Sequence, residues 1–178
     1  PAAVEFDVRL SGGKVLTIRH MDLLFPPIKI AGAGTVHLSG DMDFTADVSS
    51  GTLSVKKLPA GIVLGPIKAG TLDAALHVEG QMKERSSWRL SGLMRFDRGA
   101  IEVEGLNEPI RDAFVTLRFD QDDIQIQRMA FHLGDGDLRV SGPITHWAEA
   151  PKARLVVESS QLDVAAFVPS HRGSSAPH

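Results

Sequence analysis

The chain of 178 residues is 43% hydrophobic, carries a formal net charge of −3, and contains no cysteine and no tyrosine. This composition supports a buried apolar face, provides no basic field for nucleic acid, and excludes disulfide scaffolds and thiolate metal sites. The sequence has no apolar run of about 18 residues that would cross a bilayer as a helix, and no pattern typical of a signal peptide.

Apolar and polar residues alternate with a period of two along most of the chain, which is typical of strands with one apolar and one wet face. The strands expected from this pattern lie at 4–10, 41–48, 72–79, 88–96, 113–119, 124–126 and 138–140. Turn signals rich in Gly, Asp and Ser separate them, at 11–13, 97–99, 120–123 and 134–137. Helical turns are expected only at Thr145–Ala150 and Asp163–Val168. The sequence therefore predicts an all-β, antiparallel fold, and we expect a single highly curved sheet.

A short phrase recurs along the chain and predicts a repeat architecture. Pro-Ile-Lys occurs at 27–29 and again 39 residues later at 66–68, and Pro-Ile-Arg follows at 109–111. Repeats of this size bury their apolar faces by stacking on their neighbours. We expect residues 1–169 to form one segment of about three to four loose repeats of roughly 40–50 residues each. Residues 170–178 are expected to form a polar tail.

The alternation also assigns side chains to faces. The residues expected to line the hollow apolar surface are Phe6, Val8, Phe44, Leu76, Leu90, Phe96, Val115, Leu117, Ile126 and Val140. The residues expected to point outward are Asp43, Asp73, Arg95, Arg118 and Asp137. The apolar set is mostly aliphatic, which suits acyl chains better than stacked rings.

No pattern in the sequence predicts an active site, a metal or a cofactor. The acidic residues at 41, 43 and 47 are interpreted as a solvated strand face, and the Gly-Asp-Gly-Asp stretch at 134–137 as a hairpin turn rather than a calcium loop. The histidines show no metal-ligand spacing; His37 and His77 occupy equivalent repeat positions. Ser-Gly-Gly-Lys at 11–14 lacks the first glycine of a phosphate loop, and no nucleophile motif occurs.

The order of short phrases in the second half of the chain resembles the AsmA-like family of bacterial envelope proteins. These phrases are Leu-Ser-Gly-Leu-Met-Arg-Phe at 90–96, Gly-Leu-Asn-Glu-Pro-Ile-Arg-Asp at 105–112, Val-Thr-Leu-Arg-Phe at 115–119, His-Leu-Gly-Asp-Gly-Asp-Leu-Arg-Val-Ser-Gly at 132–142, and Leu-Asp-Val at 162–164 followed by Pro169. The similarity extends from Leu90 to Pro169, and residues 28–92 show the same repeat in a looser form.

The resemblance to AsmA-like and TamB-like proteins implies a groove rather than an enzyme. Members of this family are anchored in the inner membrane and extend through the periplasm, where they are thought to conduct phospholipids toward the outer membrane. It implies phospholipid acyl chains and membranes as partners, and a role in outer-membrane biogenesis. Because the chain begins at Pro1 rather than Met, we expect a segment of a longer protein without its anchor.

Two alternatives stay open at this point. One is a closed β-sandwich for adhesion or protein docking in the cell envelope, acting through loops such as the one at 107–112. The other is a closed, lipocalin-like lipid carrier. The three differ in what covers the apolar strand faces.

Overall fold

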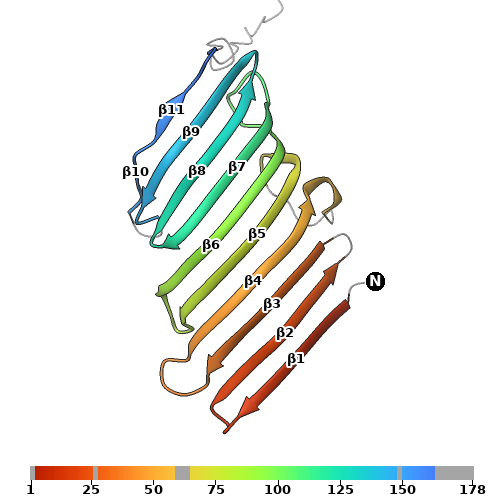
Figure 1. Cartoon of the computed structure of the whole chain (residues 1–178), viewed down its shortest axis with the longest axis vertical. Coiled ribbons are helices and arrows are strands. Elements are labelled where there is room, and N and C mark those ends of the chain that lie inside the picture. Colours follow the sequence, from red (N-terminus) through yellow and green to blue (C-terminus); the bar gives the residue numbers. More distant parts are fainter. Residues whose placement is uncertain (1–2, 26–27, 59–64, 148–149, 163–178) are drawn as a thin grey trace, which may run out of the picture.

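The computed structural model describes residues 3–25, 28–58, 65–147 and 150–162, and these form one open antiparallel sheet of 11 strands (Figure 1). The strands are β1 (Ala3–Ser11), β2 (Val15–Phe25), β3 (Ile28–His37), β4 (Asp43–Ser54), β5 (Ile67–Gln81), β6 (Glu84–Ile101), β7 (Ile110–Gln121), β8 (Asp123–Leu133), β9 (Gly136–Thr145), β10 (Lys152–Ala153) and β11 (Val156–Glu158). They lie side by side in chain order from β1 to β10, and β11 pairs with β9. The expected all-β class is confirmed.

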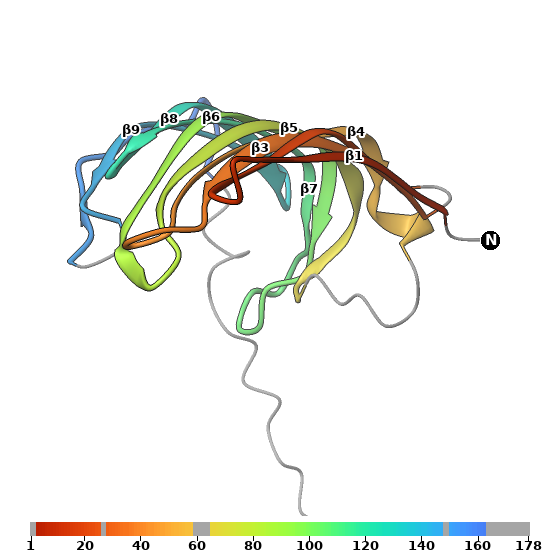
Figure 2. The same cartoon turned by 90° about the horizontal axis from the view of Figure 1, so that it is seen from below.

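The sheet is a single layer that arches from edge to edge (Figure 2). It does not close on itself, and every strand of the described residues belongs to it. The expected curved antiparallel sheet is therefore confirmed, whereas a closed sandwich or a closed barrel is not the architecture of these residues. No helix within the described ranges has the length and hydropathy needed to span a bilayer.

The recurring Pro-Ile phrases coincide with the starts of alternate strands. Ile28 opens β3, Ile67 opens β5 and Ile110 opens β7. Each strand opened in this way is followed by an antiparallel partner, so the phrase marks hairpins β3–β4, β5–β6 and β7–β8. The unit that the phrase repeats is a hairpin of two long strands.

The prediction of a turn at 97–99 is wrong. These residues lie inside β6, where the pairing with β7 shifts between Phe96 and Gly99 and Arg98 has a φ of 53°. A β-bulge places one extra residue in a continuous strand and tolerates such a backbone angle, so Asp-Arg-Gly bends the strand here instead of ending it.

The helical turns expected from the sequence are only partly described. Within the expected turn at Thr145–Ala150, the amide of Ala150 donates a hydrogen bond of 3.2 Å to the carbonyl of His146, and residues 148–149 lie outside the described residues. The turn expected at Asp163–Val168 and the tail at 170–178 lie outside the described residues. A 3-10 turn at Val55–Lys57, after β4, was not expected from the sequence.

The segment after β11 is fastened to the start of β9 by the carboxylate of Asp137. One of its oxygens accepts hydrogen bonds from the Ser160 hydroxyl at 2.5 Å and from the amides of Ser160 and Gln161 at 3.2 and 3.1 Å. The Ser159 hydroxyl donates to the Asp137 carbonyl at 2.6 Å. The hydrogen bond from the Ser160 side chain is the main reason that the pKa of Asp137 lies below its ordinary value; burial partly opposes it, and the backbone amides add to it.

We expect Asp137→Ala to release residues 159–162 from the sheet without unfolding it. Because the pKa of Asp137 is lowered, the stabilisation that its carboxylate gives to residues 159–162 is fully present above the ordinary carboxyl pKa. This stabilisation is lost as the pH falls through the folded-state pKa. Protection of the Gln161 amide from hydrogen exchange, measured by NMR relative to an unstructured amide at the same pH, should fall in the variant at neutral pH and in the wild type only in acid. The control is Asp120→Ala, which removes an exposed carboxylate from the far end of β7. Equal protection of Gln161 in the wild type and Asp137→Ala would contradict the role assigned to Asp137.

Candidate functional site

The strand registers divide the sheet into one apolar and one polar face. Residues directly opposite each other in an antiparallel pair share a face, so a row of opposite residues can be followed across the sheet. One row, running from β1 to β10, consists of Phe6, Met21, Gly32, Val48, Leu76, Gly92, Phe119, Ile124, Ile144 and Ala153. The row contains no polar side chain. We call the face that carries it the apolar face.

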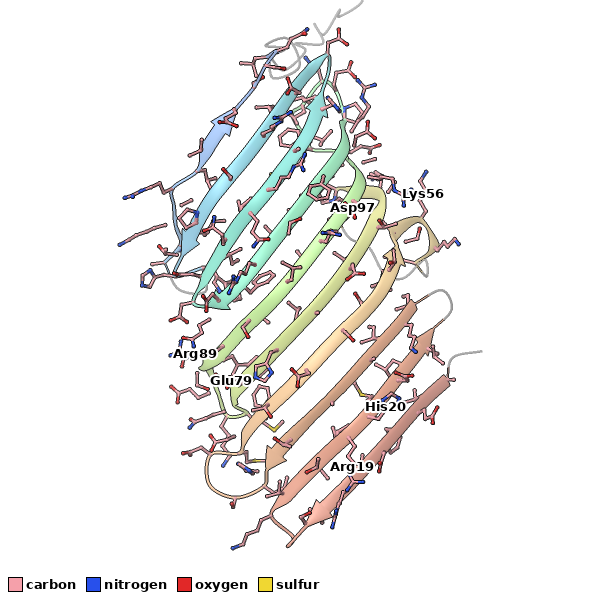
Figure 3. All side chains as sticks on the ribbon, viewed as in Figure 1. Arg19, His20, Lys56, Glu79, Arg89 and Asp97 are labelled. Carbon is pink, nitrogen blue, oxygen red and sulfur yellow. The ribbon has the colours of Figure 1, made fainter. Side chains whose placement is uncertain are left out.

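The next row along the strands belongs to the opposite, polar face. From β3 to β10 it consists of Ala33, Asp47, His77, Ser91, Asp120, Asp123, Thr145 and Lys152. Charged side chains are found along the whole length of the sheet. They include Arg19, His20, Glu79, Arg89 and Asp97, which are labelled in Figure 3. The polar face is therefore suited to contact with water.

The structure places all ten of the expected lining residues on the apolar face. Phe6 and Leu76 belong to the row given above, and the other eight lie in parallel rows of the same face. Val8 and Leu90 share a row with Ile18, Gly34, Ala46 and Val78, and Phe44 shares one with Leu16 and Val36. Leu117 and Ile126 share a row with Ala74 and Met94, and Phe96, Val115 and Val140 share one with Leu72 and Met129. The five residues expected to point outward, Asp43, Asp73, Arg95, Arg118 and Asp137, lie on the polar face.

The apolar side chains are the more crowded set. In β4, Phe44, Ala46 and Val48 are half-buried, while the alternate residues Asp43 and Asp47 are exposed. No second layer of described residues covers the sheet, so this burial comes from neighbouring side chains on the inside of the curve. The apolar face is therefore the hollow side of the arch in Figure 2.

The hollow is closed by its own side chains at one end of β6 to β9. Phe96, Ala113, Leu133 and Leu138 are buried there, with exposed fractions between 1% and 9%. Glycines make room for the Phe96 ring, because a Cβ at Gly70 would lie 2.5 Å from it, and one at Gly99 would also collide with it. These residues form the small core that holds the bend.

The hollow is open over the first strands. A depression of about 110 Å³ lies between β2 and β4, floored by Gly32, Gly34 and Ala46 and walled by side chains that include Met21 and Phe44. At β1 the apolar side chains are largely exposed, as for Phe6 at 66%. The apolar surface therefore passes from a packed core to an open trough along the long axis of the sheet.

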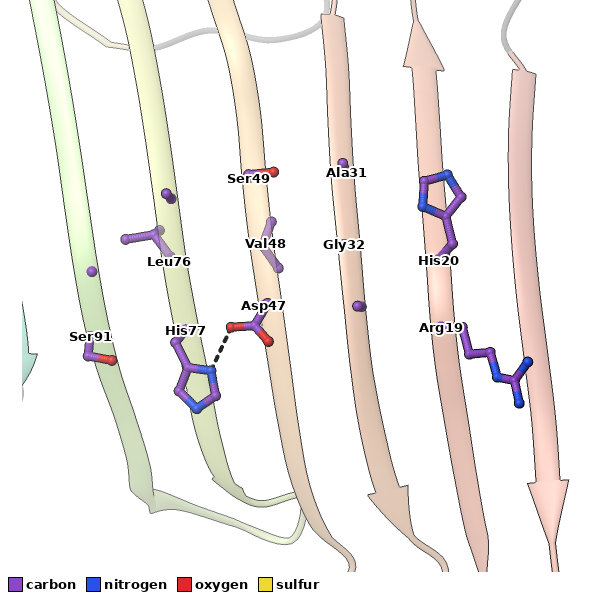
Figure 4. A pocket seen from close by; sticks show the side chains of 13 residues that line it. Arg19, His20, Ala31, Gly32, Asp47, Val48, Ser49, Leu76, His77 and Ser91 are labelled. Atoms are coloured by element: carbon purple, nitrogen blue, oxygen red, sulfur yellow. Dashed lines mark hydrogen bonds and ion pairs between the residues drawn. The ribbon is translucent and has the colours of Figure 1, made fainter.

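A second depression, of about 420 Å³, lies where Asp47, His77 and Ser91 come together from β4, β5 and β6 (Figure 4). The Nδ1 atom of His77 lies 2.8 Å from a carboxylate oxygen of Asp47, and its Nε2 atom lies 3.9 Å from Glu79. Sequence reasoning missed this row because its members are 30 and 14 positions apart and only the register aligns them.

The row does not have the geometry of a nucleophilic site. Activation of a serine needs a hydrogen bond from its hydroxyl to the imidazole, and no hydrogen bond within the described ranges joins Ser91 to His77. Likewise, no group of three or more His, Asp or Glu side chains in this part of the chain is placed to hold a metal ion. The Asp47–His77 pair is a cross-strand contact on the polar face.

Comparison with known proteins identifies no relative of this chain. No family model, no curated protein and no solved structure matches the chain. A hypothesis about function therefore depends on the two faces of the sheet and on the short sequence phrases described above.

Proposed function

We propose that the apolar face is a seat for lipid acyl chains and that the sheet is a segment of a groove that conducts phospholipids. The observation that carries this proposal is the row from Phe6 to Ala153, which crosses the sheet without a polar side chain and is covered by no second layer of described residues. Transfer of an acyl chain from water onto such a surface is favourable by about 0.8 kcal/mol for each buried CH₂ group. A long exposed apolar surface is also costly unless something covers it.

The direction and chemistry of the face favour acyl chains. The row runs perpendicular to the strands, so an extended tail can move from strand to strand without meeting a polar group. Its side chains are mainly aliphatic or Met, and at Gly32 and Gly92 no side chain rises from the floor. The polar face on the opposite side keeps the sheet in contact with water.

The cellular setting follows from the resemblance to AsmA-like proteins. On this basis the chain is a periplasmic segment of a protein anchored in the inner membrane of a Gram-negative bacterium. It provides a route for phospholipids between the inner and outer membranes and supports outer-membrane biogenesis. Its partners are acyl chains and membranes, with no role for nucleic acid or a cofactor.

Photo-crosslinking at two adjacent alanines tests the proposal. Ala74 lies on the apolar face opposite Met94, whereas Ala75 lies on the polar face opposite Leu93. We expect a photoreactive amino acid at position 74, but not at position 75, to become attached to phospholipid when the chain is produced in the periplasm and irradiated. Mass spectrometry of the purified chain identifies the adduct.

The same alanines provide the control, because the two substitutions have the same size and lie on the same strand. Labelling that is equal at both positions indicates contact with bulk membrane rather than a groove. No lipid at position 74, together with no lipid in solvent extracts of the unmodified chain, would remove the proposed function.

A further inference from the structure

The hollow of the sheet has two rims, formed by the two ends of the strands (Figure 2). The connections alternate between the rims, because each strand pairs antiparallel with the next. The turns at 12–14, 38–42, 82–83 and 122 lie on one rim, which we call the turn rim. The connections at 55–66 and 102–109 lie on the opposite rim, which we call the loop rim.

The buried apolar residues are gathered toward the loop rim. In the described part of the chain all of them except Ile126 lie in the half of their strand that ends there, namely Ile28, Phe96, Ala113, Leu133 and Leu138. Near the turn rim, the apolar face of β6–β9 carries only half-buried side chains, which are Leu90, Phe119, Ile124 and Ile144. Over these strands the hollow is therefore closed at the loop rim and open at the turn rim.

Both tryptophans of the chain lie at the open turn rim. Trp88 of β6 donates its indole N–H to the carbonyl of Gln81, the last residue of β5, at 2.9 Å. Trp147 follows β9 and donates its indole N–H to the carbonyl of Gln121, the last residue of β7, at 3.3 Å. The two tryptophans are 47% and 38% exposed. The same hydrogen bond therefore holds an exposed indole at two neighbouring turns of this rim.

The ring of Trp88 also forms part of the hollow. Its centroid lies 5.2 Å from that of Phe44 on the apolar face, and the two ring planes meet at 73°. Gly80 leaves space for the indole, since a Cβ there would lie 3.0 Å from the Cδ1 atom of Trp88. The indole thus has an apolar side toward the hollow and a polar N–H at the turn. Membrane proteins place tryptophan, which has this amphipathic character, at the level of the lipid headgroups.

The turn beside Trp88 carries an exposed apolar side chain and a cation. Met82 is 52% exposed, and the Nζ atom of Lys83 donates to the carbonyl of Gly40 at 3.4 Å. No ion pair within the described ranges involves Lys83, so its ammonium can bind a phosphate group. Cations alone do not distinguish the rims, because Lys56 and Lys57 follow β4 at the loop rim. The closed core and the two tryptophans distinguish them.

We propose that a phospholipid in the β6–β9 part of the hollow lies with its headgroup over the turn rim, at the level of Trp88, and with its acyl chains directed toward the closed core at Phe96. This inference rests on the proposed function and adds the orientation of the lipid. The strand from Trp88 to Phe96 spans about 27 Å at most. The acyl chains of one bilayer leaflet span about 15 Å. The hollow is therefore long enough to hold the chains while the headgroup stays at the rim.

Fluorescence quenching by labelled lipids tests the orientation, because the chain has two tryptophans and no tyrosine. The variant Trp147→Phe, in which Trp88 is the single tryptophan, is incubated with vesicles of phosphatidylethanolamine and phosphatidylglycerol. The vesicles contain a phospholipid that is spin-labelled either on the headgroup or at the end of an acyl chain, and the protein is then separated from them. We expect the fluorescence of Trp88 to fall more with the headgroup label than with the chain-end label. Trp147, in the variant Trp88→Phe, should show the same order.

A tryptophan near the closed end of the hollow provides the matched control. Met129 lies on the apolar face opposite Val115 and Val140, in the row of Phe96. In a chain with both native tryptophans replaced by Phe, the fluorescence of Met129→Trp should fall more with the chain-end label. Far-UV circular dichroism checks that this variant keeps its sheet, and the quenching of Trp88 decides the orientation even where Met129→Trp does not fold.

Two results would overturn the orientation and leave the proposed function in place. One is lipid in the separated protein with Trp88 quenched mainly by the chain-end label. The other is lipid in the separated protein with equal quenching of Trp88 by both labels. A separated protein that carries no lipid and is quenched by neither label would remove both the orientation and the proposed function.

Discussion

Replacing Leu117 with aspartate is expected to abolish lipid loading and to leave the sheet folded. Leu117 lies on the apolar face between Met94 and Ile126, and it is half-buried by its neighbours alone. A carboxylate in contact with acyl chains is unfavourable by about 3 kcal/mol, which corresponds to a loss of roughly a hundredfold in lipid binding. In the empty groove the same carboxylate retains part of its water, so the free energy of unfolding should fall by less than about 2 kcal/mol.

The matched control is Leu93→Asp, the same substitution on the opposite face. Leu93 is 41% exposed on β6 and lies opposite Arg118 of β7, so its replacement places a carboxylate beside a guanidinium in water. We expect no change in lipid loading and a stability within about 0.5 kcal/mol of the wild type. Lipid phosphorus per mole of purified chain and urea unfolding measure the two effects. If Leu117→Asp unfolds the chain while wild-type chain carries no lipid, the apolar face is a folding core and the groove hypothesis fails.

A methyl group at Gly92 is expected to destabilise the sheet strongly. Gly92 lies in the middle of the apolar row with a φ of 131°, a conformation that residues with a side chain rarely adopt. Its added Cβ would collide with the carbonyl oxygen of Ala75 and lie 2.9 Å from the Cα atom of Leu76. Because these are backbone atoms of the neighbouring strand, they cannot move aside without breaking the β5–β6 pairing. We expect Gly92→Ala to lower the free energy of unfolding by about 2 to 4 kcal/mol.

Gly51→Ala separates this local collision from the general effect of adding a methyl group to a strand. A Cβ at Gly51, in β4, would have no atom within 4 Å. We expect its free energy of unfolding to stay the same or to rise by up to about 1 kcal/mol, because alanine restricts the unfolded chain. Urea unfolding of the two variants under identical conditions makes the comparison. Equal stabilities would show that the β5–β6 pairing has room at Gly92 that the distances do not suggest.

The faces of the sheet could be predicted from the sequence because side-chain direction depends only on the local period of two. Phe44 and Leu76 alternate with polar residues over several positions, so each strand defines its own faces. Neighbouring strands then agree, since each strand from β1 to β9 pairs with the next one in the sequence. Long-range information was not required.

Other features of the sheet depend on contacts between strands, which the alternation of apolar and polar residues within one strand does not reveal. Asp-Arg-Gly at 97–99 has the composition of a turn, and the bulge through which the strand continues is defined by its pairing with β7, beside glycines that leave room for the Phe96 ring. The alignment of Asp47 with His77 and Ser91 depends on the register between three strands.

The chain-order topology has a consequence for folding and for growth of the sheet. From β1 to β9 each strand pairs with the next one in the sequence, so contacts form between segments that are close along the chain, and little loop-closure entropy is lost. Folding can therefore begin at any hairpin and spread by adding neighbouring strands. A duplicated hairpin inserted between two existing ones needs no rewiring of the rest, so the distance spanned by the hollow can change by whole hairpins while its width and chemistry stay the same.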